Sequence, residues 1–224
     1  CNPSRSSFLT GLRPNELEIL SNRIALRKKW PELVTLPQLF RNSGYFTAGL
    51  GKLFHMGTDD QGNQTLFRDD LSFDHFFKAM GKEPKIGLEG EGRKLGDGTV
   101  NWAQWRAAEG GDKAQADGML AAEAVRLLEE NYDQPFFIGV GFHKPHDPFV
   151  APKEYFDDYP LDDVHLSVDP DDRTALSRYA LPDAYDQFRA FTDRDRREFK
   201  RAYHACTSFV DAQVGKLLDA LDRR

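Results

Sequence analysis

The sequence has few cysteines, no long apolar run and no strong excess of one charge, and each of these absences narrows its possible roles. Cys1 and Cys206 are the only cysteines among 224 residues, too few for a disulfide framework and spaced unlike any zinc-binding pattern. No apolar run approaches the roughly 18 residues needed to cross a bilayer. The formal net charge of -6 is spread along the chain and gives no footprint for nucleic acid or for a membrane surface.

The composition is that of an ordinary globular domain. Hydrophobic residues make up 40% of the chain and charged residues 29%, and no internal repeat or low-complexity segment interrupts it. A single domain over residues 1–224 is therefore predicted. The chain opens on Cys1, inside a tight motif and without a signal-peptide pattern, so we expect a fragment that lacks segments at both ends.

Hydrophobic periodicity predicts helices that alternate with buried strands. Helices are expected over residues 3–12, 35–44, 115–132 and 192–224. The first of them should bury Phe8, Leu9 and Leu12 on one face. Strands are expected over residues 45–51 and 135–142, the second buried on both faces. A helix followed by a fully apolar strand indicates an α/β fold with a parallel sheet flanked by helices.

Two segments are predicted to lie outside this framework. Residues 86–111 are rich in glycine and charge, carry Trp102 and Trp105, and are expected to form a surface excursion that shapes a rim. Residues 157–186 are acidic and irregular. Only two strands are convincing, and an α/β sheet needs more, which supports the expectation of a fragment.

Three short motifs carry the chemistry. The first reads CNPSR at residues 1–5 and continues with LTG at 9–11, the second reads GKLFH at 51–55, and the third reads GFHKPH at 141–146. The first motif resembles the type I sulfatase signature at every fixed position. The other two look most like the iduronate-2-sulfatase branch of that family. The resemblance extends along the whole chain and implies an alkaline-phosphatase-like α/β fold.

The resemblance implies that Cys1 is oxidised to formylglycine by a separate formylglycine-generating enzyme. A hydrated aldehyde bound to a metal supplies an alkoxide nucleophile and keeps a second hydroxyl to expel sulfate, which a thiol cannot do. A helix N-terminus would add backbone N–H groups and the positive end of the dipole. Arg5, one turn further on, would hold the diol from the side. Without the full motif, a small buried thiol and a surface arginine would be the simpler interpretation.

Lys52 and His55 follow directly after the first predicted strand, at the carboxyl edge where open α/β sheets bind ligands. The resemblance implies that Lys52 contacts the sulfate and the diol, and that His55 hydrogen-bonds the diol and takes its proton. Histidine suits this task because its ordinary pKa of roughly 6.5 lies near neutrality. Taken alone, the pair could equally be a solvated lysine and a loop histidine.

The second predicted strand leads to His143, Lys144 and His146 at the same edge. His146 matches the His-X-Pro step of the family and is implied to contact the sulfate and the leaving-group oxygen. His143 and Lys144 would either bind the sugar or hold the loop. A metal site on the two histidines is the weaker alternative, because a tetrahedral site needs further ligands nearby. We predict that these residues meet Cys1 in one pocket.

The resemblance also implies a calcium ion, with Cys1 as formylglycine among its ligands and the other ligands outside residues 1–224. Because a hard dication takes six or more oxygen ligands, the chain by itself is expected to be inactive. Residues outside the motifs receive no role, namely the acidic pairs Asp59-Asp60 and Asp69-Asp70 and the histidines His75, His165 and His204.

The expected activity is hydrolysis of a sulfate ester on a sugar or glycosaminoglycan, in a periplasmic, extracellular or lysosomal compartment by family inference. The expected partners are a sulfated carbohydrate and the formylglycine-generating enzyme. Binding to nucleic acid or to a membrane is not expected. One alternative is a formylglycine-dependent phosphonate monoester or phosphodiester hydrolase, since tetrahedral oxyanion chemistry differs little between sulfur and phosphorus. Another is a non-catalytic fragment.

Overall fold

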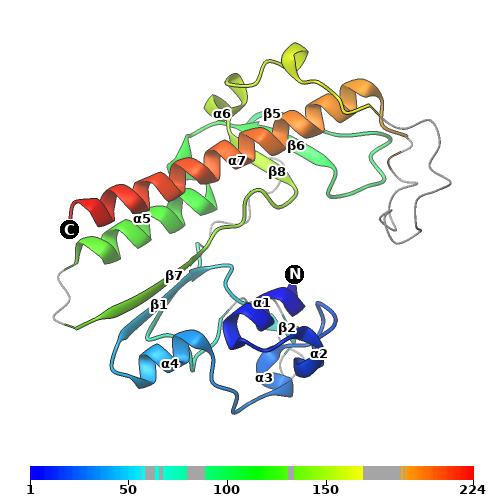
Figure 1. Ribbon diagram of the computed structural model, residues 1–224. Coiled ribbons are helices and arrows are strands. Elements are labelled where there is room, and N and C mark those ends of the chain that lie inside the picture. The colour runs from blue at the N-terminus through cyan, green and yellow to red at the C-terminus, as the bar shows by residue number, and fades with distance from the viewer. Residues whose placement is uncertain are drawn as a thin grey trace. The chain divides into compact units, whose positions relative to one another are not determined.

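The computed structural model describes residues 1–55, 57–58, 64–65, 68–79, 89–130, 134–168, 188 and 190–224 (Figure 1). The chain divides into two compact units. The first comprises Cys1–Met80, Met119–His143 and Gly215–Arg224, and the second comprises Gly81–Gly118 and Lys144–Val214. The single catalytic domain expected over residues 1–224 stays a prediction.

A three-stranded parallel sheet forms the centre of the first unit. β1 (Phe46–Gly51) lies between β4 (His75–Phe77) and β7 (Phe136–Gly141). β1 and β7 pair along their whole length, from Phe46 opposite Phe136 to Gly51 opposite Gly141. These contacts confirm both predicted strands and the parallel sheet. The sequence does not predict β4, because a strand of three residues is too short for its alternation to stand out.

Helices cover both faces of this sheet (Figure 1). The helices that precede β1 are α1 (Asn2–Thr10), α2 (Pro14–Leu17), α3 (Leu26–Lys29) and α4 (Leu36–Asn42). Phe40 of α4 stacks on Phe137 of β7 with 4.9 Å between ring centroids. On the other face, Leu120 of α5 (Ala116–Glu129) shares an apolar cluster with Leu50 of β1. A short antiparallel ladder of β2 (Gly57–Thr58) and β3 (Gln64–Thr65) follows β1.

The first and fourth helices begin and end close to the predicted residues, but of the apolar face predicted for α1 only Leu9 is buried. Thr35 caps α4 through a reciprocal capping box, and Gly44 follows that helix with φ +83. In α1, Leu9 is 2% exposed, whereas Phe8 is 60% and Leu12 36% exposed. A helix of nine residues presents only a narrow strip to the core, so helical spacing overestimates the number of buried positions.

Two glycines allow β1 and β7 to end close together. Gly51 has φ +72, and a Cβ at this position would lie 2.4 Å from the carbonyl oxygen of Gly141. A Cβ on Gly141 would lie 2.3 Å from the carbonyl oxygen of Lys52. The amide of Lys52 donates to the Gly141 carbonyl at 2.7 Å. The chain therefore turns sharply at the end of β1, and Lys52 begins the turn.

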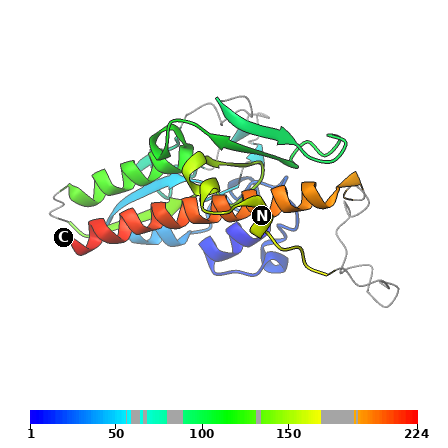
Figure 2. The ribbon, with the colours of Figure 1, turned by 90° about the horizontal axis from the view of Figure 1, so that it is seen from above.

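The second unit is built on a mixed sheet. β5 (Gly90–Lys94) and β6 (Gln104–Ala108) form an antiparallel hairpin, and β8 (Phe149–Pro152) joins β6 in parallel. α6 (Lys153–Asp157) follows β8, and 3-10 turns occur at Asp112–Ala114 and Leu161–Asp163. The part of α7 (Asp193–Asp222) that belongs to this unit packs on the sheet, and Figure 2 shows the hairpin beside it.

The surface excursion predicted at residues 86–111 is wrong for its described part, residues 89–111. Trp105 is 5% exposed, Leu95 and Ala103 are fully buried, and all three belong to the core of the second unit. The glycines that suggested a loop serve another purpose. A Cβ on Gly90 or Gly92 would lie 2.2 or 2.3 Å from a carbonyl oxygen of β6, so glycine permits the close approach of the two strands.

The last helix begins as predicted, directly after Thr192, whose hydroxyl accepts the amide N–H of Asp195 at 3.1 Å. The apolar side chains of this helix are only partly buried. Phe209 is 1% exposed, whereas Tyr203 is 44% and Leu221 48% exposed. None of the helices in the described part of the chain combines the length and the apolar character needed to span a membrane.

Glu198 of α7 is a buried charge in the second unit, with 4% of its side chain exposed. Its carboxylate accepts hydrogen bonds from Trp105 Nε1 and from Arg93 Nε, both at 2.8 Å. Burial alone raises the pKa of Glu198. Hydrogen bonds from Arg93, Trp105 and Arg194 lower the pKa by more than burial raises it, so the carboxyl stays ionised below its ordinary range.

Replacing Gly51 by alanine is expected to lower the free energy of unfolding by about 2 kcal/mol, because the left-handed backbone and the nearby Gly141 carbonyl both oppose a Cβ. Urea denaturation measures the effect. Gly215→Ala on α7 is the control, since no atom lies within 4 Å of its Cβ, and it should be neutral or slightly stabilising. Equal stability of the two variants would contradict the account of the sheet end.

The lowered pKa of Glu198 predicts a loss of stability in acid. The unfolded glutamate has a pKa of about 4.3, so the stabilisation is present above that value and disappears as the pH falls through the lower folded pKa. Urea denaturation between neutral pH and about pH 3 should show a shallower decline for Glu198→Gln than for the wild type. Glu109→Gln, at an exposed position, should follow the wild-type decline. Identical slopes for all three proteins would refute the role of this carboxylate.

Candidate active site

The first turn of α1 brings Cys1 and Arg5 together. Cys1 is exposed and stands at the N-cap of the helix. Arg5 Nε donates to Cys1 Sγ at 3.2 Å. Cys1 is unmodified here, so its sulfur stands in for the oxygens that a formylglycine would carry. The guanidinium therefore lies where it can hold such an oxygen by a charge-assisted hydrogen bond.

Arg5 also ties α1 to the turn after β1. Its Nη1 donates to the carbonyl oxygens of Lys52 and Leu53, the latter at 3.1 Å. Burial lowers the pKa of Arg5, but a guanidinium remains charged at neutral pH. Lys52 itself is 6% exposed. An ammonium in such a place is costly to desolvate unless it is hydrogen-bonded or paired.

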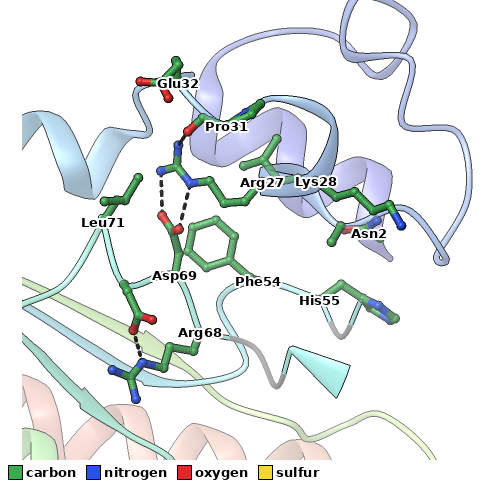
Figure 3. Close-up of a pocket in the computed structure, with 13 residues that line it drawn as sticks. Asn2, Arg27, Lys28, Pro31, Glu32, Phe54, His55, Arg68, Asp69 and Leu71 are labelled. Carbon is green, nitrogen blue, oxygen red and sulfur yellow. Dashed lines mark hydrogen bonds and ion pairs between the residues drawn. The ribbon is translucent and has the colours of Figure 1, made fainter. Parts of the chain in front are cut away.

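A pocket of about 460 Å³ lies in the first unit beside this turn (Figure 3). Asn2 and His55 both line it, so the first and second sequence motifs meet at its wall. Its other lining residues are Ala25, Leu26, Arg27, Lys28, Pro31, Glu32, Phe54, Arg68, Asp69, Asp70 and Leu71. The pocket mixes apolar surface with charged groups of both signs.

The acidic pair Asp69-Asp70, which receives no role from the sequence, pairs with arginines of this pocket (Figure 3). Arg27 binds Asp69 bidentately, with Nε and Nη2 each 2.8 Å from a carboxylate oxygen. Asp69 has only 4% of its side chain exposed, and Arg68 pairs with Asp70. The other acidic pair, Asp59-Asp60, lies outside the described residues.

The N-terminus of α1 offers fewer backbone donors than the sequence suggests. The amide of Asn2 already donates to Asn22 Oδ1 at 2.8 Å, and Pro3 has no amide hydrogen. The amide of Arg5 donates to the Cys1 carbonyl at 3.1 Å. Of the first turn this leaves the amide of Ser4. Recognition of an anion at this helix end therefore falls mainly to the side-chain cations.

The third motif divides between the two units. His143 follows β7 in the first unit, whereas Lys144 and His146 belong to the second. Lys144 Nζ donates to the carbonyls of Pro148 at 2.7 Å and His146 at 3.3 Å, and the Lys144 amide donates to Asp117 Oδ2 at 2.8 Å. Of the two expected roles for Lys144, these contacts favour holding the loop. The convergence of His146 with Cys1 stays a prediction.

His146 is half exposed, and its ring contacts the next residue, Asp147. Its Nδ1 lies 2.7 Å from the backbone oxygen of Asp147 and 3.2 Å from a carboxylate oxygen of the same residue. This arrangement favours a proton on Nδ1 and leaves Nε2 as the nitrogen available to a substrate. The histidines that receive no role from the sequence include His75, whose Nε2 lies 3.0 Å from Glu123, and His204, whose ring stacks on Tyr159.

The described part of the chain does not provide a set of calcium ligands. Those residues contain no group of three or more histidine, cysteine, aspartate or glutamate side chains that could hold a metal ion. The partner of Cys1 Sγ is the guanidinium of Arg5, a cation. Since a hard dication takes six to eight oxygen ligands, the described residues do not fit the ion by themselves.

Sequence analysis misses Asn22 and Asp117, which each hold a backbone amide of one of the motifs. Asn22 binds the amide that follows Cys1, and Asp117, 2% exposed, binds the amide of Lys144. Asn22 lies in a loop without a motif, so no signal marks it. Asp117 carries a weak signal, because a carboxylate among the apolar residues at the start of a buried helix needs a partner.

Solved structures show the class of fold. The phosphonate monoester hydrolase of Agrobacterium radiobacter matches with a TM-score of 0.67 and 20% identity, over 99% of this chain and 50% of that one. The phosphonate monoester hydrolase SpPMH of Silicibacter pomeroyi matches with a TM-score of 0.68 and 19% identity, over 100% and 50%. The fold is therefore alkaline-phosphatase-like α/β, with a parallel sheet flanked by helices.

Sequence comparison shows the family. The family model described as Sulfatase matches residues 1–224, and the chain belongs to the sulfatase family. Iduronate 2-sulfatase of Mus musculus is 31% identical, over 99% of this chain and 43% of that protein. A protein named Sulfatase from Formosa agariphila is 31% identical, over 99% and 46%. The chain thus spans less than half the length of these relatives.

Proposed function

We propose that the protein to which this chain belongs hydrolyses sulfate esters of sugars or glycosaminoglycans, with Cys1 converted to formylglycine as the nucleophile. The observation that carries the proposal is the contact of Arg5 with Cys1 Sγ at 3.2 Å, in a turn that the same guanidinium ties to Lys52. Family membership supports the reaction, and the name of the murine relative, iduronate 2-sulfatase, supports a sulfated sugar as substrate.

The formylglycine would supply a geminal diol. One hydroxyl would lose its proton to solvent and attack sulfur as the bond from sulfur to the alcohol oxygen breaks, and the other would be kept to re-form the aldehyde as the carbon–oxygen bond to sulfate breaks. Arg5 would hold the attacking oxygen and oppose its charge, and Lys52 would neutralise the sulfate oxygens. His55 would accept the proton of the retained hydroxyl when sulfate leaves. His146, through Nε2, would protonate the alcohol oxygen as its bond to sulfur breaks. His143 would bind the sugar or hold the loop.

Several parts of this proposal rest on the family alone. They are the formylglycine-generating enzyme as partner, a calcium ion that Cys1, as formylglycine, would help to bind, and a periplasmic, extracellular or lysosomal compartment. Inductively coupled plasma mass spectrometry of the purified full-length protein would establish whether calcium is bound.

A phosphonate monoester or phosphodiester hydrolase is the second candidate. It is favoured by the fold shared with the phosphonate monoester hydrolases of Agrobacterium radiobacter and Silicibacter pomeroyi. Parallel assays of the full-length protein with an aryl sulfate, an aryl phosphonate and a phosphodiester separate the two. A higher kcat/KM for either phosphorus ester than for the sulfate would reverse the assignment.

Cys1→Ser in the full-length protein is expected to abolish turnover of an aryl sulfate while leaving the thermal melting temperature almost unchanged. Serine preserves the size of the side chain but provides no diol when no serine-converting enzyme is present. Cys206→Ala is the control, because that thiol is fully buried in the second unit. It should lose some stability but keep kcat. Wild-type turnover by Cys1→Ser would show that Cys1 is not the nucleophile.

Arg5→Lys is expected to lower kcat/KM for the aryl sulfate by roughly hundredfold, because one ammonium cannot replace the three separate contacts of the guanidinium. The rates are compared at equal formylglycine content, measured by mass spectrometry of the peptide that contains Cys1. Arg223→Lys, an exposed arginine in the same unit, should retain the wild-type value. A similar value for both variants would remove Arg5 from the mechanism.

A further inference from the structure

The residue that follows Cys1 is fastened to a loop that no motif marks. Asn2 is 3% exposed, and its amide N–H donates to Asn22 Oδ1 at 2.8 Å. Its side-chain Nδ2 donates to the carbonyls of Ile24 at 2.6 Å and Ser21 at 3.1 Å. Three hydrogen bonds thus join one residue to residues 21–24, which we name the anchoring loop.

We propose that Asn22 is a positioning residue for Cys1, an inference that rests on the proposed function. Arg5 contacts the side chain of Cys1 from the helix side, but nothing in that contact fixes the backbone at the helix start. The bond from the Asn2 amide to Asn22 does so, because this amide belongs to the peptide bond that Cys1 itself forms. A nucleophile displaced by about 1 Å loses much of its rate, so the bond acts on kcat.

The chemistry of Asn22 suits a place beside an anion. An amide oxygen satisfies the N–H at the helix start without adding charge, whereas aspartate at the same place would satisfy it and repel the sulfate. Asn2 and His55 also line the same pocket (Figure 3). A shift of Asn2 would therefore alter the pocket wall as well as the position of Cys1.

The test compares Asn22→Ala and Asn22→Asp in the full-length protein. Asn22 lies outside the CNPSR motif, so formylglycine formation should continue, and its extent is measured by mass spectrometry. Per formylglycine, Asn22→Ala should lower kcat for an aryl sulfate by roughly tenfold or more with little change in KM. Asn22→Asp should restore most of kcat but raise KM by roughly three- to tenfold, and added salt should reduce that rise.

Asn15→Ala and Asn15→Asp are the matched controls, because Asn15 is exposed on α2 in the same unit and is not part of the anchoring loop. Both should keep the wild-type kcat and KM. An Asn22→Ala protein with wild-type kcat per formylglycine, or an Asn22→Asp protein that shows no recovery of kcat, would overturn the positioning role while leaving the proposed function intact. A wild-type protein without sulfatase turnover would instead overturn the proposed function, and this inference with it.

Discussion

The contact between the Arg5 guanidinium and its three acceptors is the interaction on which the site depends. One planar cation bonds the sulfur of Cys1 and the carbonyls of Lys52 and Leu53, which come from segments about fifty residues apart in the chain. Its fork geometry fixes direction as well as distance. Arg5 therefore holds both Cys1 and the turn that carries Lys52, and neither can move without straining the other.

The end of β1 supplies the other half of this arrangement. Glycine at positions 51 and 141 lets two parallel strands finish within contact of each other's backbone, and the Lys52 amide closes the turn on the Gly141 carbonyl. A side chain at either glycine would push Lys52 away from the sheet edge. The strands thus do more than form a core. Their last residues also set the position of the Lys52 and Leu53 carbonyls, which accept hydrogen bonds from Arg5.

Much of the fold and of the candidate site could be predicted from the sequence, and the features that could not be predicted have physical causes. The CNPSR motif and the strand ending in Gly51 identify the family and the segment that carries Lys52. The hairpin of the second unit is missed because its glycines are typical of loops, although here they permit close strand packing. Asn22 is missed because a bond from a loop side chain to a helix start depends on tertiary geometry, which local spacing does not encode.

The two thiols of the chain differ in solvent exposure, and they therefore differ in reactivity. Cys206 is fully buried, and burial raises its pKa to about 12, whereas Cys1 stands exposed at the surface of its unit. A thiol-directed label applied to the folded protein at neutral pH would consequently reach one cysteine and spare the other. If Cys1 is converted as proposed, an aldehyde-directed label used beside this reagent would separate converted from unconverted molecules and so measure the extent of conversion on intact protein.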